Sequence, residues 1–230
     1  MKSRISAKNS QPEPVANDKK NTKENILETA RQLFNEHGVE AVTVRHIAGE
    51  LGISHGNLCY HFPRKEDIIF KLYGRIVEGM SAELARQTPD NITLSTVLEA
   101  LHHSYELQYH YKFLMIDFVN IMRRIPEIRE NFREIFDVRK QQFSFLIALL
   151  QHQGLFRTDI PAEQIERFIL QSYLMGDFWM SESEILFIGK EPDKSRFYAT
   201  LAGSMFFPYL TAKGRHEYEQ FYRQYQERTP

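Results

Sequence analysis

The sequence predicts an all-α fold, in which a small three-helix unit at the N-terminus precedes a larger helical body. Apolar residues recur every three or four positions through most of the chain, which is the period of a helix that buries one face. No stretch of useful length alternates apolar and polar residues as a half-buried strand does, and no internal repeat is present.

Glycine and proline mark several of the expected helix ends. Gly38 is expected to end the first long helix, because glycine is favoured just past a helix C-terminus, and Pro126 to open a later one. Residues 183–189 are assigned to no element. Helices are expected over residues 22–38, 43–51, 54–62, 64–86, 94–108, 109–122, 126–153, 161–180, 193–210 and 215–227.

Composition narrows the class of protein. With 42% hydrophobic residues over 230 positions, the chain can bury a core, so global disorder is not expected. A single cysteine excludes an internal disulfide and fits a reducing compartment. No apolar run approaches the roughly 18–20 residues of a membrane span, and the N-terminus lacks the apolar core of a signal peptide. We therefore expect a soluble cytoplasmic protein.

Charge is unevenly distributed, although the formal net charge is only −1. Residues 1–75 hold 12 Lys and Arg against 9 Asp and Glu, whereas residues 76–230 hold 17 against 21. The net charge argues against a protein coated all over with nucleic acid. A mildly basic first third on an acidic body instead suits a protein that offers one face to phosphate.

Residues 43–65, TVRHIAGELGISHGNLCYHFPRK, organise the rest of the chain. They predict two short helices, capped by Thr43 and Ser54, with Gly52 in the turn between them because only glycine takes positive φ at little cost. A helix, a glycine-containing turn and a helix are the plan of a helix-turn-helix, whose second helix enters the DNA major groove. The residues expected to face inward are Val44, Ile47, Ala48, Leu51, Leu58 and Phe62.

Together with the preceding helix, this stretch resembles the DNA-binding domain of the tetracycline-repressor (TetR/AcrR) family. Two departures are present: Cys59 stands where the family usually has a tyrosine, and Pro63–Arg64 replaces a segment that usually carries a serine cap. The resemblance implies a transcriptional regulator, expected to be a repressor. The matching motifs are A-R-x-L-F-x-x-x-G at 30–38, T-V-R-x-I-A at 43–48, and L-G-I-S-x-G-N-L-x-Y-H-F with a following K-E-D at 51–67.

Three domains follow from this reading. Residues 1–21 are polar, which predicts a disordered arm that either touches DNA through its lysines or is simply solvated. Residues 22–68 are expected to form the helix-turn-helix DNA-binding domain. Residues 69–230 are expected to form the helical regulatory and dimerisation domain.

The resemblance also implies which residues touch DNA, where the motifs match. Thr43 lies at a helix N-terminus, where hydroxyl and backbone N–H groups hold phosphate, and the fork of Arg45 suits a phosphate or a guanine edge. His55 and Asn57 are the expected base readers, and Lys65 resembles the family's phosphate contact. For the two caps and the last histidine, a plain structural role is the alternative. The full set is Thr43, Arg45, Ser54, His55, Gly56, Asn57, Tyr60, His61 and Lys65.

In the body, the resemblance implies a homodimer and a pocket for a small-molecule effector. A two-fold dimer would set two heads on a pseudo-palindromic operator in double-stranded DNA. The last two large helices, 161–180 and 193–210, are expected to form the dimer interface. Aromatic residues expected to line the pocket of an apolar or aromatic effector, with ordinary core packing as the alternative, are Tyr105, Tyr109, Phe113, Phe118, Phe143 and Trp179.

Neither a metal nor a cofactor is expected, and no enzyme motif is present. His102, His103 and His110 invite a metal site, but adjacent histidines on a helix point roughly 100° apart and no cysteine or carboxylate pair completes the ligand set. The motifs G-x-S-x-G and H-E-x-x-H and the nucleotide-binding loops are absent. Cys59 is expected to be a small buried apolar residue, with a redox switch as the alternative.

Two alternatives to an effector-responsive regulator stay open. One is a DNA-binding protein without an effector, such as a nucleoid or division-site factor, which an empty or collapsed body would favour. The other is a ligand carrier or an enzyme that keeps the head as a vestige. The missing catalytic motifs and the complete recognition helix argue against the second alternative.

Overall fold

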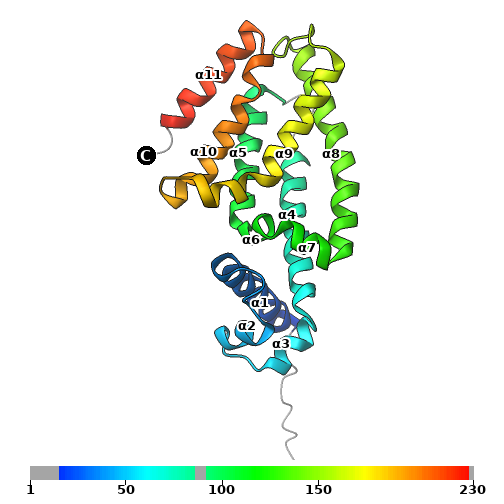
Figure 1. Cartoon of the computed structure of the whole chain (residues 1–230), viewed down its shortest axis with the longest axis vertical. Helices are drawn as coiled ribbons and strands as arrows, with labels where there is room; N and C mark the ends of the chain where they lie inside the picture. Colours follow the sequence, from blue (N-terminus) through cyan, green and yellow to red (C-terminus); the bar gives the residue numbers. More distant parts are fainter. Residues whose placement is uncertain (1–15, 86–91, 228–230) are drawn as a thin grey trace, which may run out of the picture.

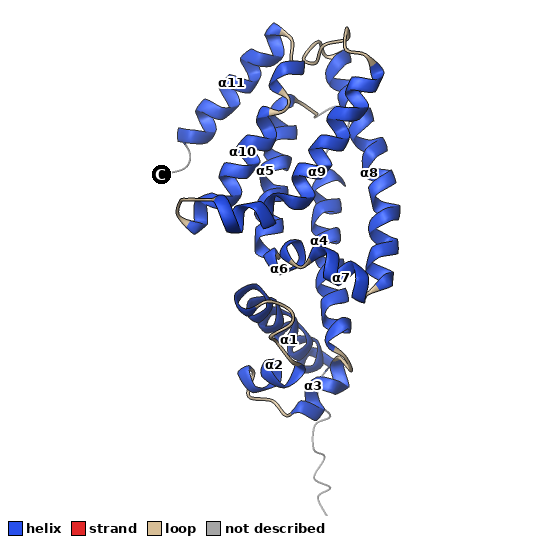
Figure 2. Ribbon diagram, viewed as in Figure 1, coloured by secondary structure: helices blue, strands red, loops and turns tan. Residues whose placement is uncertain are grey.

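Figure 1 shows an elongated molecule, with a small head at one end and a larger body at the other. The computed structural model describes residues 16–85 and 92–227, and every regular element in these ranges is a helix (Figure 2). One isolated antiparallel bridge, between Phe156 and Leu210, accompanies the helices. The predicted all-α fold is confirmed. Among the described helices, none combines the length and the apolar character that a membrane crossing needs.

The head consists of α1 (Ala16–His37), α2 (Val44–Glu50) and α3 (His55–His61), and α4 (Lys65–Ala85) leads from it into the body (Figure 1). Apolar side chains from all four helices meet in one core, which fixes α2 and α3 against α1. The buried members are Ile26, Leu27, Ala30, Phe34, Val39, Val42, Ile47, Ala48, Leu58, Phe62, Ile68 and Ile69.

The first helix begins earlier than predicted. α1 starts at Ala16, so Thr22 lies inside the helix and does not cap it. The stretch before Thr22 contains no glycine or proline from Ala16 onward and includes two lysines, which are good helix formers. The predicted arm over 1–21 is therefore wrong for residues 16–21, and its remainder lies outside the described residues.

The body is built from the remaining helices, which run mostly along the long axis (Figure 1). α9 continues six residues past its predicted end at 180, into the stretch that was assigned to no element. The bounds are α5 (Leu94–His110), α6 (Lys112–Ile116), α7 (Phe118–Arg124), α8 (Pro126–His152), α9 (Ala162–Leu186), η1 (Glu191–Asp193), α10 (Lys194–Ser204), η2 (Phe207–Tyr209) and α11 (Ala212–Glu227).

The single helix predicted over 109–122 is wrong, because the chain breaks there into α6 and α7. Tyr111 (φ −113°, ψ 39°) and Asp117 (φ −90°, ψ 17°) leave the helical conformation. The head holds both breaks in place: the Asn35 side-chain oxygen accepts a hydrogen bond from the Phe113 amide at 3.1 Å, and the Asp117 carboxylate accepts one from the Val39 amide at 3.3 Å. The apolar periodicity could not predict these hydrogen bonds between the head and the body.

The head is also fastened to the C-terminal end of α5. The His110 carbonyl accepts a hydrogen bond from Arg31 Nη1 at 2.8 Å and another from Asn35 Nδ2 at 2.9 Å. Beside them the rings of Phe34 and Phe113 pack with centroids 5.1 Å apart. A movement of α5 is thus transmitted directly to α1.

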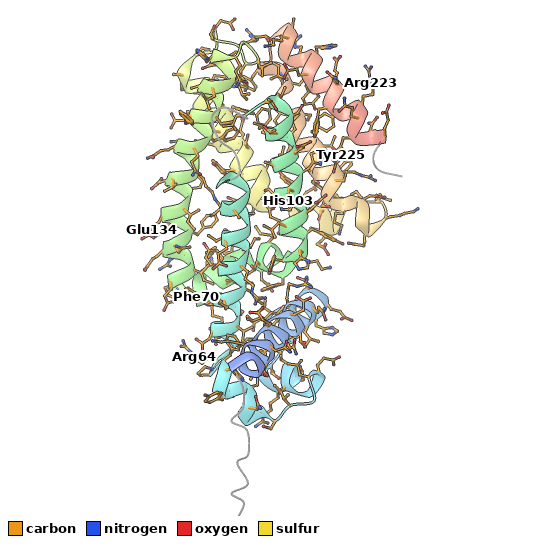
Figure 3. The ribbon with its side chains drawn as sticks, turned by 180° about the vertical axis from the view of Figure 1, so that it is seen from behind. Arg64, Phe70, His103, Glu134, Arg223 and Tyr225 are labelled. Atoms are coloured by element: carbon orange, nitrogen blue, oxygen red, sulfur yellow. The ribbon has the colours of Figure 1, made fainter. Side chains whose placement is uncertain are left out.

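A second core fills the far end of the body. It includes Leu98 of α5, Leu150 of α8, Phe168 of α9, Phe206 after α10 and Phe221 of α11. α11 lies along the outer edge of the body in Figure 1, and Figure 3 shows its Arg223 and Tyr225 at the end opposite to Arg64 at the start of α4. This core is separate from the first one, which continues from the head into the near part of the body through residues that include Tyr105, Phe113 and Trp179.

Candidate nucleic-acid interface and ligand cavity

The turn between α2 and α3 has the geometry that its residues predict. Thr43 Oγ1 accepts a hydrogen bond from the His46 amide, and Ser54 Oγ accepts one from the Asn57 amide, each at 3.2 Å. Gly52 has φ +65°, in the left-handed region that favours glycine. Both predicted caps and the predicted glycine turn are confirmed.

The polar side of α3 faces solvent at the end of the molecule farthest from the body (Figure 1). Leu58 and Phe62 are buried in the head, whereas Tyr60 keeps 71% of its surface exposed. The nine residues expected to touch DNA stay on the head surface and none is buried against the body. Exposed are Thr43, Arg45, Ser54, His55, Gly56, Asn57 and Tyr60, and half-buried are His61 and Lys65.

Lys65 has an internal role that the sequence did not reveal. Its Nζ donates hydrogen bonds to the carbonyls of Val39 at 2.6 Å and Val42 at 3.0 Å, and so joins the start of α4 to the loop between α1 and α2. Burial, with a smaller contribution from the charge of Arg124, lowers the pKa of Lys65. One N–H of the ammonium group remains for a phosphate, so the predicted DNA contact stays a prediction.

Cys59 is half-buried and does not lie in the apolar core, so the expected buried apolar position is wrong. Its Sγ lies 3.4 Å from Nε2 of His55, one helical turn earlier on α3. The reason is the spacing of four residues, which puts both side chains on the same face of the helix.

Pro63–Arg64 stands where the family usually has a serine that caps the next helix, so α4 lacks that cap. The side chain of Asp67 caps the helix instead. The Asp67 carboxylate accepts hydrogen bonds from the Arg64 amide and from Arg64 Nη2, each at 2.9 Å. An acidic side chain in the first turn also suits the positive end of the helix dipole. The start of α4, and with it Lys65, is thereby fixed.

The body contains a cavity of about 420 Å³ between α5, α8, α9 and α10. Tyr105 and Phe143, two of the six residues expected to line a pocket, do line it. The indole of Trp179 lies behind Tyr105, stacked on its ring with centroids 5.0 Å apart, and so is part of the core and not of the lining.

The other three expected lining residues lie elsewhere. Phe113 packs against Phe34 at the junction of head and body, and Phe118 packs against Phe132. Tyr109 donates a hydrogen bond to Glu191, the first residue of η1. Their aromatic side chains suggested a pocket lining, but the sequence did not show which surface each would meet.

The polar part of the lining was not predicted from the sequence. Asp177 on α9, Arg139 on α8, and Tyr173 and Gln108 also face the cavity. Burial raises the pKa of Asp177 to about 6, against a smaller opposing effect of Arg139. The sequence feature that pointed to a polar lining is the acidic residue in the otherwise apolar run LMGDFWM, because a carboxylate among apolar residues usually has a partner.

The three histidines do not gather around a common point. His102 is buried against α11, where its ring centroid lies 4.3 Å from that of Tyr225, whereas His103 lines the cavity and His110 is exposed at the end of α5. Within residues 16–85 and 92–227 no three His, Cys, Asp or Glu side chains are arranged as metal ligands.

A capped, glycine-hinged helix pair with an exposed polar second helix, carried on a helical body with a cavity, defines a helix-turn-helix DNA-binding regulator. Comparison with known families agrees. Residues 26–72 match "Bacterial regulatory proteins, tetR family", and residues 75–218 match the TetR domain described as "Bacterial transcriptional repressor". The chain belongs to the TetR family of bacterial regulatory proteins and is a DNA-binding transcriptional regulator.

Sequence identity to individual relatives is low. The chain is 28% identical over 149 residues to the transcriptional repressor AcnR of Corynebacterium efficiens, covering 65% of this chain and 76% of the relative. It is 27% identical over 158 residues to the repressor KstR2 of Mycobacterium tuberculosis, covering 67% and 78%. A TetR-family regulator from Marinobacter aquaeolei VT8 has a similar solved structure, with a TM-score of 0.79, 25% identity, and coverage of 89% of this chain and 98% of that one.

Proposed function

We propose that the protein is an effector-responsive repressor that binds a pseudo-palindromic operator as a homodimer in the cytoplasm. The observation that carries the proposal is an apolar stripe left exposed on the outer side of the body. A single head contacts few base pairs, so a second copy related by two-fold symmetry is needed for useful affinity.

The stripe runs along two helices. On α9, Leu170, Leu174 and Phe178 recur every four residues and expose 42%, 63% and 42% of their surfaces; on α10, Phe197 and Leu201 expose 53% and 46%. Contiguous apolar surface of this kind on a folded protein marks an interaction site. The stripe lies within the two predicted interface ranges, which supports dimerisation through α9 and α10.

The cavity favours a regulator that binds an effector over a DNA-binding protein without an effector. Its volume of about 420 Å³ falls in the range of roughly 300–1,000 Å³ that ligand sites occupy, and the body around it is well packed, not collapsed. Tyr105 and Gln108 line it from α5, whose last carbonyl, that of His110, is bonded to α1 of the head. An occupant that displaces α5 would therefore change the position of the head.

The relatives favour repression, since AcnR and KstR2 are both named transcriptional repressors. In this mechanism the head binds DNA when the cavity is empty, and an occupied cavity moves the two heads out of register with their half-sites. The phosphate contacts position the dimer and the side chains of α3 read base edges in the major groove.

Selection of bound duplexes from a random DNA pool tests the proposal. We expect enrichment of two inverted half-sites whose centres are roughly 34–36 Å, or a multiple of that distance, apart. Enrichment of single half-sites, or no enrichment over input DNA, would count against a dimeric operator-binding protein. Sedimentation of the unbound protein at micromolar concentration, where a stable dimer is expected, gives an independent measurement.

A further inference from the structure

The polar side chains of the cavity gather around Asp177. Tyr173 precedes it by one turn on α9, Tyr105 faces it from α5 and Arg139 from α8. Burial, and then the Asp177 carboxylate, raises the pKa of Tyr105. For Tyr173, burial is again the largest cause of a raised pKa, with smaller effects of Arg139 and Asp177. The four groups therefore form one electrostatically coupled cluster.

Polar groups of this cluster lack hydrogen-bond or ion-pair partners among the described residues. Tyr105 is 1% exposed, and its hydroxyl is buried without a hydrogen-bond partner among the described residues. No hydrogen bond or ion pair joins the Asp177 side chain to another residue of the described part. The guanidinium of Arg139 donates to Met80 Sδ, a weak acceptor, at 3.3 Å. A buried polar group without a partner is costly, so an occupant that supplies the missing bonds gains affinity.

The balance of charge at Asp177 favours a cation. The Asp177 side chain forms no ion pair with Arg139, whose guanidinium donates to Met80 Sδ, so the half-buried carboxylate has no positively charged group bonded to it among the described residues. Burial also raises the pKa of this carboxyl to about 6, against a smaller opposing effect of Arg139. Tyr173 lies one helical turn before Asp177 and Tyr105 lines the same cavity, and tyrosine ring faces attract cations. A carboxylate on Arg139 would instead leave Asp177 without a partner and add a like charge nearby.

The rest of the cavity is apolar. Val97, Leu146, Phe143 and Phe206 also line it, on α5, α8 and the segment after α10, and the ring of Phe143 packs against that of Tyr173 with centroids 6.1 Å apart. Such a surface excludes a small ion with a full hydration shell and accepts a hydrocarbon or aromatic group. The lining therefore combines a small polar cluster with a largely apolar surface.

We propose that the effector is an amphipathic primary amine, whose ammonium group donates hydrogen bonds to Asp177 and to the Tyr105 hydroxyl and whose apolar body fills the remainder of the cavity. This inference rests on the proposed function, because it names the chemistry of the molecule to which the repressor responds. The amine supplies both the missing donor and the missing positive charge.

Three probes with one skeleton test it: 4-phenylbutylamine, 4-phenylbutanol and 4-phenylbutyrate, titrated calorimetrically into the full-length protein at pH 7.5. We expect the amine to bind at least about tenfold more tightly than the alcohol, since a hydrogen bond to a charged group has that effect, and the carboxylate to bind most weakly. An alcohol equal to the amine, a carboxylate that binds most tightly, or no binding of any probe would overturn the proposal.

Matched variants locate the effect. Asp177→Asn keeps the shape and should cost the amine at least about tenfold in affinity while leaving the alcohol within about twofold. Glu134→Gln makes the same chemical change on the exposed outer side of α8 (Figure 3) and should alter neither. Should Asp177→Asn fail to fold, Tyr105→Phe removes only the hydroxyl and should lower the preference for the amine over the alcohol. An unchanged preference in the folded variant would overturn the assignment.

The two proposals fail in different ways. Operator selection and sedimentation contain no probe, so their outcome does not depend on the chemistry of the cavity. If inverted half-sites are selected but the amine is not preferred, the proposed dimeric operator-binding function is supported and the proposed amine effector is wrong. Release of the selected operator by the amine from wild-type protein, but not from Asp177→Asn at the same concentration, would support both.

Discussion

Lys65 Nζ lies 2.6 Å from the Val39 carbonyl, so the first residue of α4 is bonded to the loop that leads into α2. The same ammonium group donates to Val42 at 3.0 Å. The residue expected to touch DNA thus also fixes the helix-turn-helix unit to the helix that connects it to the body. This contact fastens α4, which also contributes Met80 to the cavity lining, to the helix-turn-helix unit.

Replacing Lys65 by methionine should destabilise the head. The two carbonyls lose a charged donor while the apolar stem remains, and we expect the free energy of unfolding to fall by about 1–3 kcal/mol. Urea denaturation followed by circular dichroism measures it. Lys71→Met, at an exposed position of α4, is the control and should change stability by less than about 0.5 kcal/mol. Equal stability of the two variants would show that the hydrogen bonds from Lys65 to the two carbonyls do not stabilise the head.

Arg45→Ala should weaken DNA binding without affecting the fold, because Arg45 is exposed at the start of α2. If it neutralises one phosphate, the slope of log K against log salt concentration should decrease by about one for every duplex. If it reads guanine instead, the slope stays and preference at one base pair relaxes. Arg133→Ala, exposed on α8 of the body, is the control. An Arg45→Ala variant that binds like this control at all salt concentrations would remove Arg45 from the interface.

Tyr60→Phe separates the hydroxyl from the ring at an exposed position of α3. We expect a loss of about 0.5–1.5 kcal/mol in binding to all duplexes if the hydroxyl donates to a phosphate, with an unchanged midpoint of thermal unfolding. Fluorescence anisotropy with the selected operator and with a scrambled duplex measures both affinities. A loss confined to the operator would instead assign Tyr60 to base recognition.

The head was predictable from its sequence because its signals are local. Caps at Thr43 and Ser54 and the turn at Gly52 depend on residues a few positions apart, and each was correctly predicted. The body depends on long-range contacts: the break at Asp117 is held by Val39, and Trp179 is core because Tyr105 stands between it and the cavity. Periodicity identifies a buried face, but not the partner that buries it.

Leu174→Glu should convert the dimer into a monomer. Leu174 is 63% exposed in the middle of the apolar stripe on α9, so a carboxylate there costs little in the isolated chain but would be buried at a two-fold interface. Sedimentation at micromolar concentration should give the monomer mass, and affinity for a two-site operator should fall to that of a half-site. Val138→Glu, at a similarly exposed position on α8, is the control and should stay dimeric. A dimeric Leu174→Glu variant would move the interface elsewhere.

His102 should make the body sensitive to mild acid. It is 3% exposed beneath α11, and burial, with a smaller effect of Arg196, lowers its pKa from 6.5 to about 4. Between these values the unfolded chain binds a proton that the folded chain does not. The free energy of unfolding should therefore fall as the pH decreases from 6.5 to 4, by about 3 kcal/mol, and His102 should have no effect above pH 6.5.

His102→Phe isolates this contribution, because a phenyl ring fits among the rings of Phe221, Tyr222 and Tyr225 and cannot take up a proton. Urea denaturation at several pH values between 4 and 7.5 should show a smaller loss of stability on acidification for the variant than for the wild type. His103→Asn removes the adjacent, exposed histidine and is the matched comparison. If His102→Phe instead parallels the wild type across this range, other groups control the acid sensitivity, and α11 is held to α5 by its aromatic contacts without a titrating residue beneath it.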